Sequence, residues 1–507
     1  MDAAARYYYA RDYDETERCC RELIADDERH FDALHLLGVV QLDRGQLAEA
    51  VGHLTRAVDE RPDDAQANYH LGTALLGQRQ FEQAESVLRR SLAGQPDDAG
   101  TLNNLGNSLI GQGRSAEALE CFQHILRSQP KHLSARYNAG RSLAALDRLE
   151  EAVVAFQAAL VDAPVDTSGD RLADIYSGLG QALAALGRYD EALMSCRAIA
   201  TFRPGMAAWN ESLVLLQLGN FADGWRKYES RWEVPDHDKL RPDARVPDLA
   251  EAAGKRVLLL PEQGHGDLIQ FARYAPLLAA RGARVSLQTY VELKPLMQTL
   301  EGVEAVISPE EEEPASDFVT PLLSLPLMFG TDLGSIPAQV PYLRPPADRL
   351  ATWRQRVGVR TRRRIGVAWW GVQHIPKRSL SIDVLHPLLS LDEFEFHSLQ
   401  KTAPGTHPAL IEHGADLEDF ADTAALISLL DLVVTIDTSV AHLAGALGAP
   451  VWIMLKHDAD WRWLLDRDDS PWYPTARLFR QRQRGDWGNV IAAIVAALRQ
   501  PRAPVRT

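Results

Sequence analysis

"LVVTIDTSVAHLAGALGAPVWIML", residues 432–455, contains two apolar runs separated by an alanine-rich segment with helical periodicity. The first run ends at Asp437, and Thr438 and Ser439 follow where a helix should begin. A Gly-Ala-Pro turn then leads into the second run. This order predicts strand, helix and parallel strand. Because parallel α/β units hold anions on the free N–H groups at such a helix start, the stretch predicts an anion site after Asp437.

The same alternation extends over the second half of the chain. "RVLLLPEQGHGDLIQFARYAPLLAARGARVSLQTY" reads as strand, glycine-containing turn, helix and strand. A proline-rich segment, "IPAQVPYLRPP", separates it from a second unit that begins with "RRIGVAWWG". Strands that alternate with helices predict two parallel-sheet domains that face one another. We assign a linker, the two domains and a tail to residues 234–253, 254–346, 347–500 and 501–507.

The first half contains small and rigid residues that recur every 34 residues. Each unit between them has two amphipathic segments, and such helix pairs stack because none can bury its apolar face alone. These positions closely resemble the tetratricopeptide repeat, or TPR. The resemblance implies a TPR α-solenoid over residues 1–233. The recurring residues are Gly38, Gly72, Gly106 and Gly140; Ala50, Ala84, Ala118 and Ala152; and Pro62, Pro96, Pro130 and Pro164.

TPR superhelices expose a concave groove that binds extended peptides or partner proteins. His70, Asn104 and Asn138 each stand two residues before a marker glycine and form a polar row that could bond to a peptide backbone. The alternative is that these side chains are solvated or satisfy neighbouring turns. The repeats by themselves fit either a scaffold or an enzyme.

Composition excludes several classes of function. The 507 residues carry a formal net charge of −15, so the chain lacks the positive field of a general nucleic-acid or anionic-membrane binder. The N-terminus lacks the basic start and apolar core of a secretory signal, and the apolar runs are short. We expect a cytoplasmic protein with reduced cysteines, no nucleic-acid partner and no membrane insertion.

Four stretches carry a second resemblance. "QGHGDLIQFARY", "FHSLQK", "DFADTAALISLLDLVVTIDTSVAHLAGALGAPVW" and "DWRWLLDRDDSPWYPTARLFRQ" resemble the C-terminal region of bacterial TPR-linked glycosyltransferases. That region is similar to lipopolysaccharide heptosyltransferases and, more distantly, to O-linked N-acetylglucosamine transferase. The resemblance implies a GT-B fold, in which the second Rossmann-like domain holds a nucleotide-sugar donor and the acceptor enters the cleft.

GT-B enzymes generally work without a divalent metal. The resemblance therefore implies neither metal nor cofactor, with the nucleotide-sugar as a co-substrate. The acidic triplets "DHD" at 236–238 and "DAD" at 458–460 look like metal ligands, but neither follows an apparent core strand. We interpret both as loop acids.

Glycosyl transfer needs a stabiliser for the phosphate that leaves. Thr438 and Ser439 can donate hydroxyl hydrogen bonds beside the first N–H groups of the helix, and His442 lies one turn further on. The alternatives are that Thr438 or Ser439 only caps the helix and that His442 is structural.

Further donor contacts are predicted at strand ends of the second domain. Lys401 ends the apparent strand "FEFHSLQ", and Lys377 and Arg378 lie in the loop after "VAWWG"; ordinary surface basicity is the alternative. By resemblance, Asp419 and Thr423 contact the nucleoside, unless Asp422 or Thr423 simply starts the next helix. Relatives usually have a Trp-Ser-Gly-Asn-like segment where this chain has "WWGVQHIPKRS", which leaves the donor open.

The transfer also needs a base for the attacking hydroxyl. Asp267 in "GHGD" matches the aspartate that has this role in heptosyltransferases, although aspartate is also a common N-cap. His265 is the reserve candidate because imidazole titrates near neutrality. Gly264 and Gly266 allow a tight turn and a close approach of the substrate.

The prediction is a glycosyltransferase that moves a sugar from a nucleotide donor to Ser or Thr of a protein held by the TPR array. Flagellin is one candidate acceptor that the resemblance suggests. One alternative is a non-catalytic TPR adaptor with a degenerate GT-B module. The other is a transferase or epimerase that acts on small carbohydrates.

Overall fold

The computed structural model describes residues 1–234, 241, 243–371 and 379–500. Contacts divide the chain into two compact units, Met1–Ala207 and Ala208–Thr507. The boundary falls within helix α13 (Pro204–Gln217), so the contacts group residues 208–233 with the α/β region that follows.

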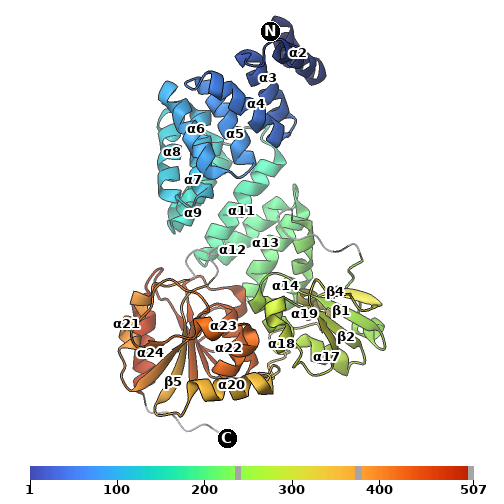
Figure 1. Cartoon of the computed structure of the whole chain (residues 1–507), viewed down its shortest axis with the longest axis vertical. Helices are drawn as coiled ribbons and strands as arrows, with labels where there is room; N and C mark the ends of the chain where they lie inside the picture. The colour runs from blue at the N-terminus through green and yellow to red at the C-terminus, as the bar shows by residue number, and fades with distance from the viewer. Residues whose placement is uncertain (235–240, 242, 372–378, 501–507) are drawn as a thin grey trace. The chain divides into compact units, whose positions relative to one another are not determined.

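The first unit is an array of antiparallel helix pairs (Figure 1). Several first helices of a pair begin at a side chain that accepts a backbone N–H of the first turn, such as Asp64 from Ala67 and Asp98 from Thr101. Left-handed glycines such as Gly113, at φ +76°, close turns between helices. The helices are α1 (Asp2–Tyr9), α2 (Tyr13–Asp26), α3 (Phe31–Asp43), α4 (Leu47–Glu60), α5 (Ala65–Gly77), α6 (Phe81–Gly94), α7 (Ala99–Gly111), α8 (Ser115–Ser128), α9 (Leu133–Ala145), α10 (Leu149–Val161), α11 (Gly169–Ala185) and α12 (Tyr189–Ile199).

The recurring glycines lie where paired helices approach one another most closely. A Cβ added to Gly72 would lie 2.5 Å from Cγ of Leu88, and one added to Gly106 would lie 2.4 Å from Cζ of Phe122. Real Cβ atoms do not make such contacts, so only glycine fits without a shift of the opposing side chain or of its helix. The 34-residue period therefore marks the contact between the two helices of each pair.

We expect Gly106→Ala to destabilise the first unit by about 1–3 kcal/mol, because the new methyl group overpacks against Phe122. Gly52→Ala is the matched control, since Gly52 is a helical glycine of α4 with no described atom within 4 Å of its added Cβ. The control should stabilise by about 1 kcal/mol through helix propensity. Thermal melts followed by circular dichroism test the pair, and equal shifts in both variants would contradict the assigned role of Gly106.

The second unit opens with helices that precede its first sheet: α14 (Phe221–Tyr228), the 3₁₀ turn η1 (Glu229–Glu233) and α15 (Leu249–Ala252). The first sheet is parallel, in the order β3-β2-β1-β4. Its strands are β1 (Arg256–Leu260), β2 (Arg284–Gln288), β3 (Val303–Ile307) and β4 (Phe318–Pro321). The connections contain α16 (His265–Phe271), α17 (Tyr274–Ala280), η2 (Val291–Leu293), α18 (Lys294–Met297), η3 (Leu322–Ser324) and α19 (Leu325–Met328).

The second sheet is also parallel, in the order β10-β9-β8-β5-β6-β7. Its strands are β5 (Arg363–Ala368), β6 (Phe394–Ser398), β7 (Leu410–Ile411), β8 (Leu432–Ile436), β9 (Val451–Leu455) and β10 (Ala476–Arg480). Its helical segments are α20 (Ala347–Val357), η4 (Ile382–Leu385), α21 (His386–Leu389), η5 (Gly414–Asp416), α22 (Phe420–Ile427), α23 (Ser439–Ala446), η6 (Trp461–Trp463) and α24 (Trp487–Arg499).

Helices cover both faces of the second sheet, as the layers in Figure 1 show. Helices α21 and α24 pack with Ile365 and Val434 on one face, whereas α22 and α23 pack with Val433 and Ile453 on the other. Strand β8 is buried along its whole length, which explains its continuous apolar sequence. The strand, helix and strand predicted from residues 432–455 are confirmed.

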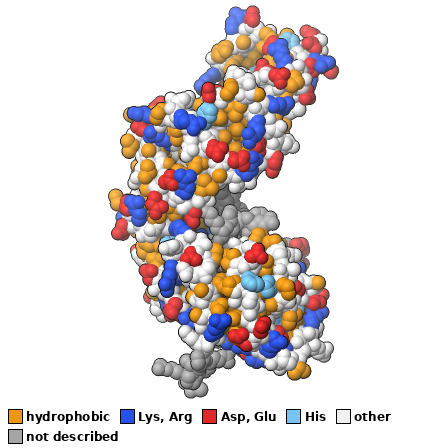
Figure 2. Space-filling model, turned by 90° about the vertical axis from the view of Figure 1, so that its left-hand side faces the viewer, with side chains coloured by type: hydrophobic (Ala, Val, Ile, Leu, Met, Phe, Trp, Pro, Cys, Tyr) orange, Lys and Arg blue, Asp and Glu red, His pale blue; other side chains and the backbone are white. Residues whose placement is uncertain are grey.

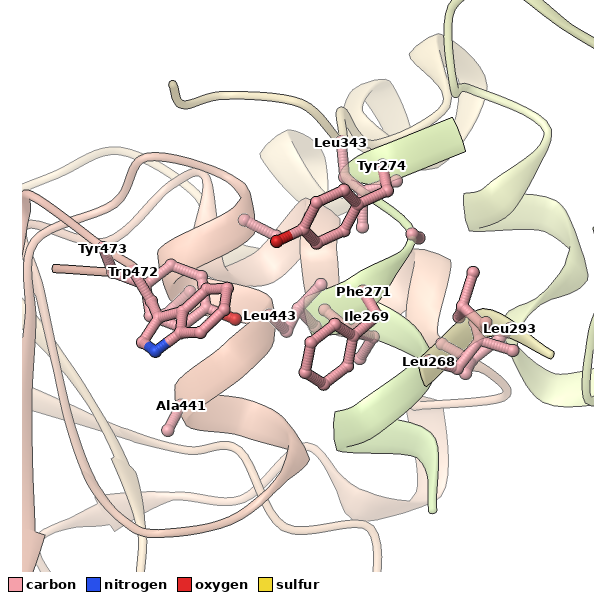
Figure 3. Close-up of a cluster of buried hydrophobic side chains, with 14 of the residues drawn as sticks. Leu268, Ile269, Phe271, Tyr274, Leu293, Leu343, Ala441, Leu443, Trp472 and Tyr473 are labelled. Atoms are coloured by element: carbon pink, nitrogen blue, oxygen red, sulfur yellow. The ribbon is translucent and has the colours of Figure 1, made fainter. Parts of the chain in front are cut away.

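The helix that follows β1 and the helix that follows β8 lie side by side. Figure 3 shows Ile269 and Phe271 on α16 beside Leu443 on α23, with Trp472 and Tyr473 closing the same cluster. All five side chains are buried. The apolar contact brings the N-termini of the two helices to the same part of the unit.

The surface in Figure 2 mixes acidic and basic side chains. Among the helices of the described residues, none combines the length and apolarity that a membrane crossing needs.

Candidate functional site

The carboxyl ends of β1, β5, β6 and β8 meet around one cavity of about 620 Å³. In the second sheet β5 lies between β8 and β6, so the chain winds in opposite directions from the β5–β8 pair. Open α/β sheets bind ligands at such a switch point. The cavity is lined by Gly264, His265, Gly266, Asp267, Glu292, Trp370, Gly371, Leu399, Gln400, Lys401, Thr402, Leu417, Glu418, Asp419, Phe420, Thr423, Asp437, Thr438, Ser439, Val440, His442, Asp460 and Arg462.

The start of α23 faces this cavity with Asp437, Thr438, Ser439 and Val440. Thr438 occupies the N-cap position, yet within the described part of the chain its side chain makes no capping hydrogen bond to the helix. Its hydroxyl lies 3.4 Å from that of Thr435 instead. The positive end of the helix dipole thus points toward the cavity. The alternative that the Thr438 hydroxyl caps the helix is therefore wrong.

The turn after β5 approaches α23 closely. A Cβ added to Gly371 would lie 3.3 Å from the methyl group of Thr438, so a larger residue would crowd the start of the helix. Oε1 of Gln400 accepts the backbone N–H groups of Trp369 and Trp370, both at 2.8 Å, and fixes the turn. Sequence reasoning missed Gln400, although a polar residue just beyond a buried strand was the available signal.

Asp267 lies at the third position of α16, after the N-cap Gly264. Its Oδ2 accepts the N–H of Gly264 at 2.9 Å, and its Oδ1 accepts Nη2 of Arg462 at 2.5 Å. Arg462 is buried and also donates to Oδ1 of Asp460 at 2.8 Å. Asp267 is therefore not the N-cap but half of a capping box. It is also bonded to a cation that sequence reasoning missed.

His265 is held between two aromatic rings. Its ring centroid lies 4.7 Å from that of Tyr290 and 5.2 Å from that of Phe420. Its Nε2 lies 3.6 Å from Oε2 of Glu292, and the pKa of Glu292 is lowered first by the N–H of its own backbone and then by His265. A carboxylate beside an imidazole can orient the ring. Glu292 is a second residue that sequence reasoning missed.

His442 is buried at the contact between α23 and α16. Its Nδ1 lies 3.0 Å from the hydroxyl of Tyr473, and its ring stacks on Trp463 at 5.3 Å. A Cβ added to Gly266 would lie 2.9 Å from Cδ2 of His442, so Gly266 allows the close approach of the two helices. His442 both lines the cavity and packs the helix contact.

Lys401 lines the cavity, and its Nζ donates to the carbonyl of Glu418 at 2.8 Å. Asp419 is the N-cap of α22, since its Oδ1 accepts Ala421 N at 2.8 Å and Asp422 N at 3.2 Å. The alternative that Asp422 or Thr423 starts this helix is therefore wrong, although Asp419 and Thr423 both line the cavity. Lys377, Arg378 and the triplet at 236–238 lie outside the described residues.

The acidic triplet at 458–460 lies in a loop and at the cavity, whereas the aromatic residues that follow it are buried in the interior of the unit. Asp458 is a loop acid paired with Lys456 at 3.3 Å, whereas Asp460 caps η6 and lines the cavity. Among the described residues, no group of three or more His, Cys, Asp or Glu side chains is arranged to hold a metal ion. The aromatic residues pack the interior of the unit: Trp461, Trp463, Trp472 and Tyr473 are all buried.

The three polar residues predicted for the acceptor groove join successive first helices of the repeats. His70 on α5 pairs with His35 on α3 at 2.8 Å. Asn104 on α7 donates to Thr73 on α5 at 2.9 Å, and Asn138 on α9 donates to Asn103 on α7 at 3.0 Å. These bonds give the polar row a role between repeats. Its contact with an acceptor stays a prediction.

The His35–His70 pair should make the array sensitive to acid. Burial, followed by the charge of His35, lowers the pKa of His70 to about 4, whereas an unfolded histidine titrates near about 6.5. As the pH falls from about 6.5 to about 4, the unfolded chain takes up a proton that folded His70 excludes, so stability is lost across this window. We expect His70→Gln to flatten the pH dependence of the thermal midpoint between pH 7 and 5. An unchanged slope would contradict this role.

Comparisons with known proteins identify the first unit. Family models described as "Tetratricopeptide repeat" match residues 1–65 and 103–167, residues 41–102 and residues 174–193. The N-terminal region is therefore a TPR solenoid, as predicted, and it is followed by parallel α/β sheets.

The chain is 28% identical over 359 residues to Protein FlbA of Caulobacter vibrioides. The match covers 62% of this chain and 59% of FlbA, so the chain spans less than two thirds of that relative.

Several solved structures are similar to part of the chain. MamA is 24% identical, with a TM-score of 0.31, and covers 32% of this chain and 95% of its own. YrrB, described as a TPR protein with an unusual peptide-binding site, is 19% identical, with a TM-score of 0.31, and covers 37% and 95%. A tetratricopeptide repeat protein from Parabacteroides merdae is 15% identical, with a TM-score of 0.39, and covers 45% and 89%.

Proposed function

We propose that the second unit is a GT-B glycosyltransferase that takes a sugar from a nucleotide donor, and that the TPR array presents a protein acceptor to it. One observation carries the proposal. The start of α23, which can bind a phosphate, lines the same cavity as the carboxylate of Asp267, which can accept a proton. A volume of about 620 Å³ lies within the range of small-molecule sites.

The chemistry follows from these positions. A Ser or Thr hydroxyl of the acceptor attacks the anomeric carbon, the bond from that carbon to the phosphate oxygen breaks, and Asp267 takes the hydroxyl proton. The departing phosphate gathers negative charge beside Thr438, Ser439 and the first amides of α23. Lys401, which also lines the cavity, adds a positive charge. Attack from the face opposite the phosphate inverts the anomeric centre, and the step needs no metal or cofactor.

The remaining predicted residues have supporting roles. His265, beside Glu292, is the alternative proton acceptor. Gly264 and Gly266 let the substrate and α23 approach the start of α16. Phe420, Asp419 and Thr423 line the part of the cavity proposed for the nucleoside. Protein acceptors, with flagellin as one candidate, are proposed because TPR arrays bind proteins.

A non-catalytic adaptor is the second candidate, because both carboxylate oxygens of Asp267 already accept hydrogen bonds. The test is incubation of the purified full chain with a panel of nucleotide-sugars, with release of the nucleoside diphosphate as the readout. We expect turnover of one donor, with its loss in Asp267→Ala. Binding of donors without turnover of any would favour the adaptor.

The acceptor is tested separately. Intact-mass analysis of proteins from cells with and without this chain should reveal one protein that loses the mass of a sugar. Removal of residues 1–203, which precede α13, should abolish that modification and leave donor hydrolysis in place. Loss of hydrolysis with a folded fragment would contradict the separate role of the array.

A further inference from the structure

The turn that leads from β1 into the cavity contains a residue in an unfavourable backbone conformation. Gln263 has a φ of +57°, in the left-handed region that non-glycine residues rarely adopt. Gly264 to Asp267, which line the cavity, follow it directly. A conformation of this kind persists only where the surroundings hold it, and such residues cluster at functional sites.

Two tyrosines hold Gln263. Its Nε2 donates to the hydroxyl of Tyr228 at 2.8 Å, and its carbonyl accepts the hydroxyl of Tyr290 at 2.5 Å. Tyr228 is the last residue of α14 and is buried. The bond from Tyr228 thus connects a helix that precedes both sheets to the turn at the edge of the cavity.

The neighbouring residue Glu262 is held from the same side. Its carboxylate accepts Nε of Arg231 at 2.7 Å, Nη2 of Arg231 at 3.1 Å and the N–H of Leu323 at 2.9 Å. Arg231, in η1 just after α14, is buried and also bonds Glu229 at 2.7 Å and Ser324 at 2.8 Å. A buried guanidinium with so many partners has a single geometry.

The same helix packs against both segments that carry the Asp267–Arg462 pair. The ring of Trp225 on α14 lies 6.0 Å from Phe271 on α16 and 5.2 Å from Trp461 in η6, both edge to face. Phe271 is the last residue of α16, which carries Asp267 in its first turn. Trp461 directly precedes Arg462. Helix α14 is thus placed to fix the distance between the two ends of that ion pair.

We propose that Tyr228 and Arg231 are positioning residues, which act through Gln263 and Glu262 to hold the Gly264–Asp267 turn in the geometry that the cavity needs. Helix α14 and the turn η1 then contribute to the geometry of the site, although neither lines the cavity. The expected change in catalytic rate rests on the proposed function. The expected opening of the Gly264–Asp267 turn does not.

The test is Tyr228→Phe in the full chain, with amide hydrogen exchange measured by mass spectrometry. The amides of Gly264, Asp267 and Leu268 are hydrogen-bonded within this turn and report its opening. Loss of one net hydrogen bond should speed their exchange by about tenfold. Tyr274→Phe is the matched control, because the buried hydroxyl of Tyr274 bonds Thr331 at 2.8 Å and should leave the turn unchanged.

A second variant distinguishes local opening of the turn from a general loss of stability. Gln263→Gly removes the same hydrogen bond and tolerates the positive φ, so it should speed exchange at the same amides. Unchanged exchange in both variants, or faster exchange spread evenly over the second unit, would overturn the proposal. If the wild-type chain turns over a donor, we expect a fall in kcat with little change in KM for the donor. Local opening together with no wild-type turnover would support the positioning role and reject the glycosyltransferase.

Discussion

Asp267→Asn is expected to lower the turnover number for glycosyl transfer by about 10²–10⁴-fold while the protein still binds its donor. The substitution keeps the size of the side chain and removes the group that takes the proton from the acceptor hydroxyl, and general bases contribute rate factors of this order. The proposed phosphate contacts are made by other residues, Thr438 and Ser439 at the start of α23. Initial rates with saturating donor, together with donor titration by calorimetry, measure the two effects separately.

Asp460→Asn is the matched control for Asp267. Both carboxylates line the cavity and both accept hydrogen bonds from Arg462, at 2.5 Å for Asp267 and 2.8 Å for Asp460. Each substitution replaces one of the two carboxylates that pair with the buried Arg462. We expect Asp460→Asn to keep turnover within about tenfold of the parent, because the proposed base is intact. Equal losses in the two variants would assign Asp267 a structural role and favour His265 as the base.

Removal of the buried cation should have the largest effect on stability. Arg462→Met leaves Asp267 and Asp460 close together without their shared partner, and breaking a buried ion pair typically costs about 3–5 kcal/mol. The side chain also donates to Oε1 of Gln270 at 3.0 Å, so a buried amide loses its partner as well. We expect a clear fall in the denaturant midpoint of the second unit.

Arg467→Met controls for the loss of an arginine from the same loop. Arg467 pairs with the exposed Asp469 at 2.6 Å, and such surface pairs contribute about 0–1 kcal/mol. Its denaturant midpoint should stay close to that of the parent. A similar fall in both variants would show that the Arg462 network does not stabilise the fold as described.

The sequence allowed prediction of those features that depend on local pattern. The 34-residue period predicted the helix pairs because a glycine is needed wherever an opposing side chain, such as Phe122 beside Gly106, leaves no room for a Cβ. The strand, turn and helix around Thr438 were predictable because a buried parallel strand is apolar throughout and the helix start follows it directly. Such signals lie within a few residues of the feature that they predict.

The rest of the candidate site depends on contacts between distant segments. Arg462 meets Asp267 across 195 residues of sequence, so neither residue alone indicated the pair. Asp419 and Asp422 are both suitable caps, and only the fold shows that Asp419 starts the helix while Asp422 accepts the indole N–H of Trp353. The inter-repeat bond of Asn138 was equally hidden, because its partner Asn103 belongs to the previous repeat.

The central claim is that the phosphate of a nucleotide donor binds the first amides of α23. The most direct measurement is hydrogen exchange at Ser439 and Val440 in the presence of a panel of nucleoside diphosphates. The claim predicts that at least one nucleotide binds with a Kd on the order of micromolar to millimolar, as is usual for enzyme substrates, and slows exchange at these two amides. Binding that leaves both amides unchanged, or no binding by any nucleotide of the panel, would contradict it.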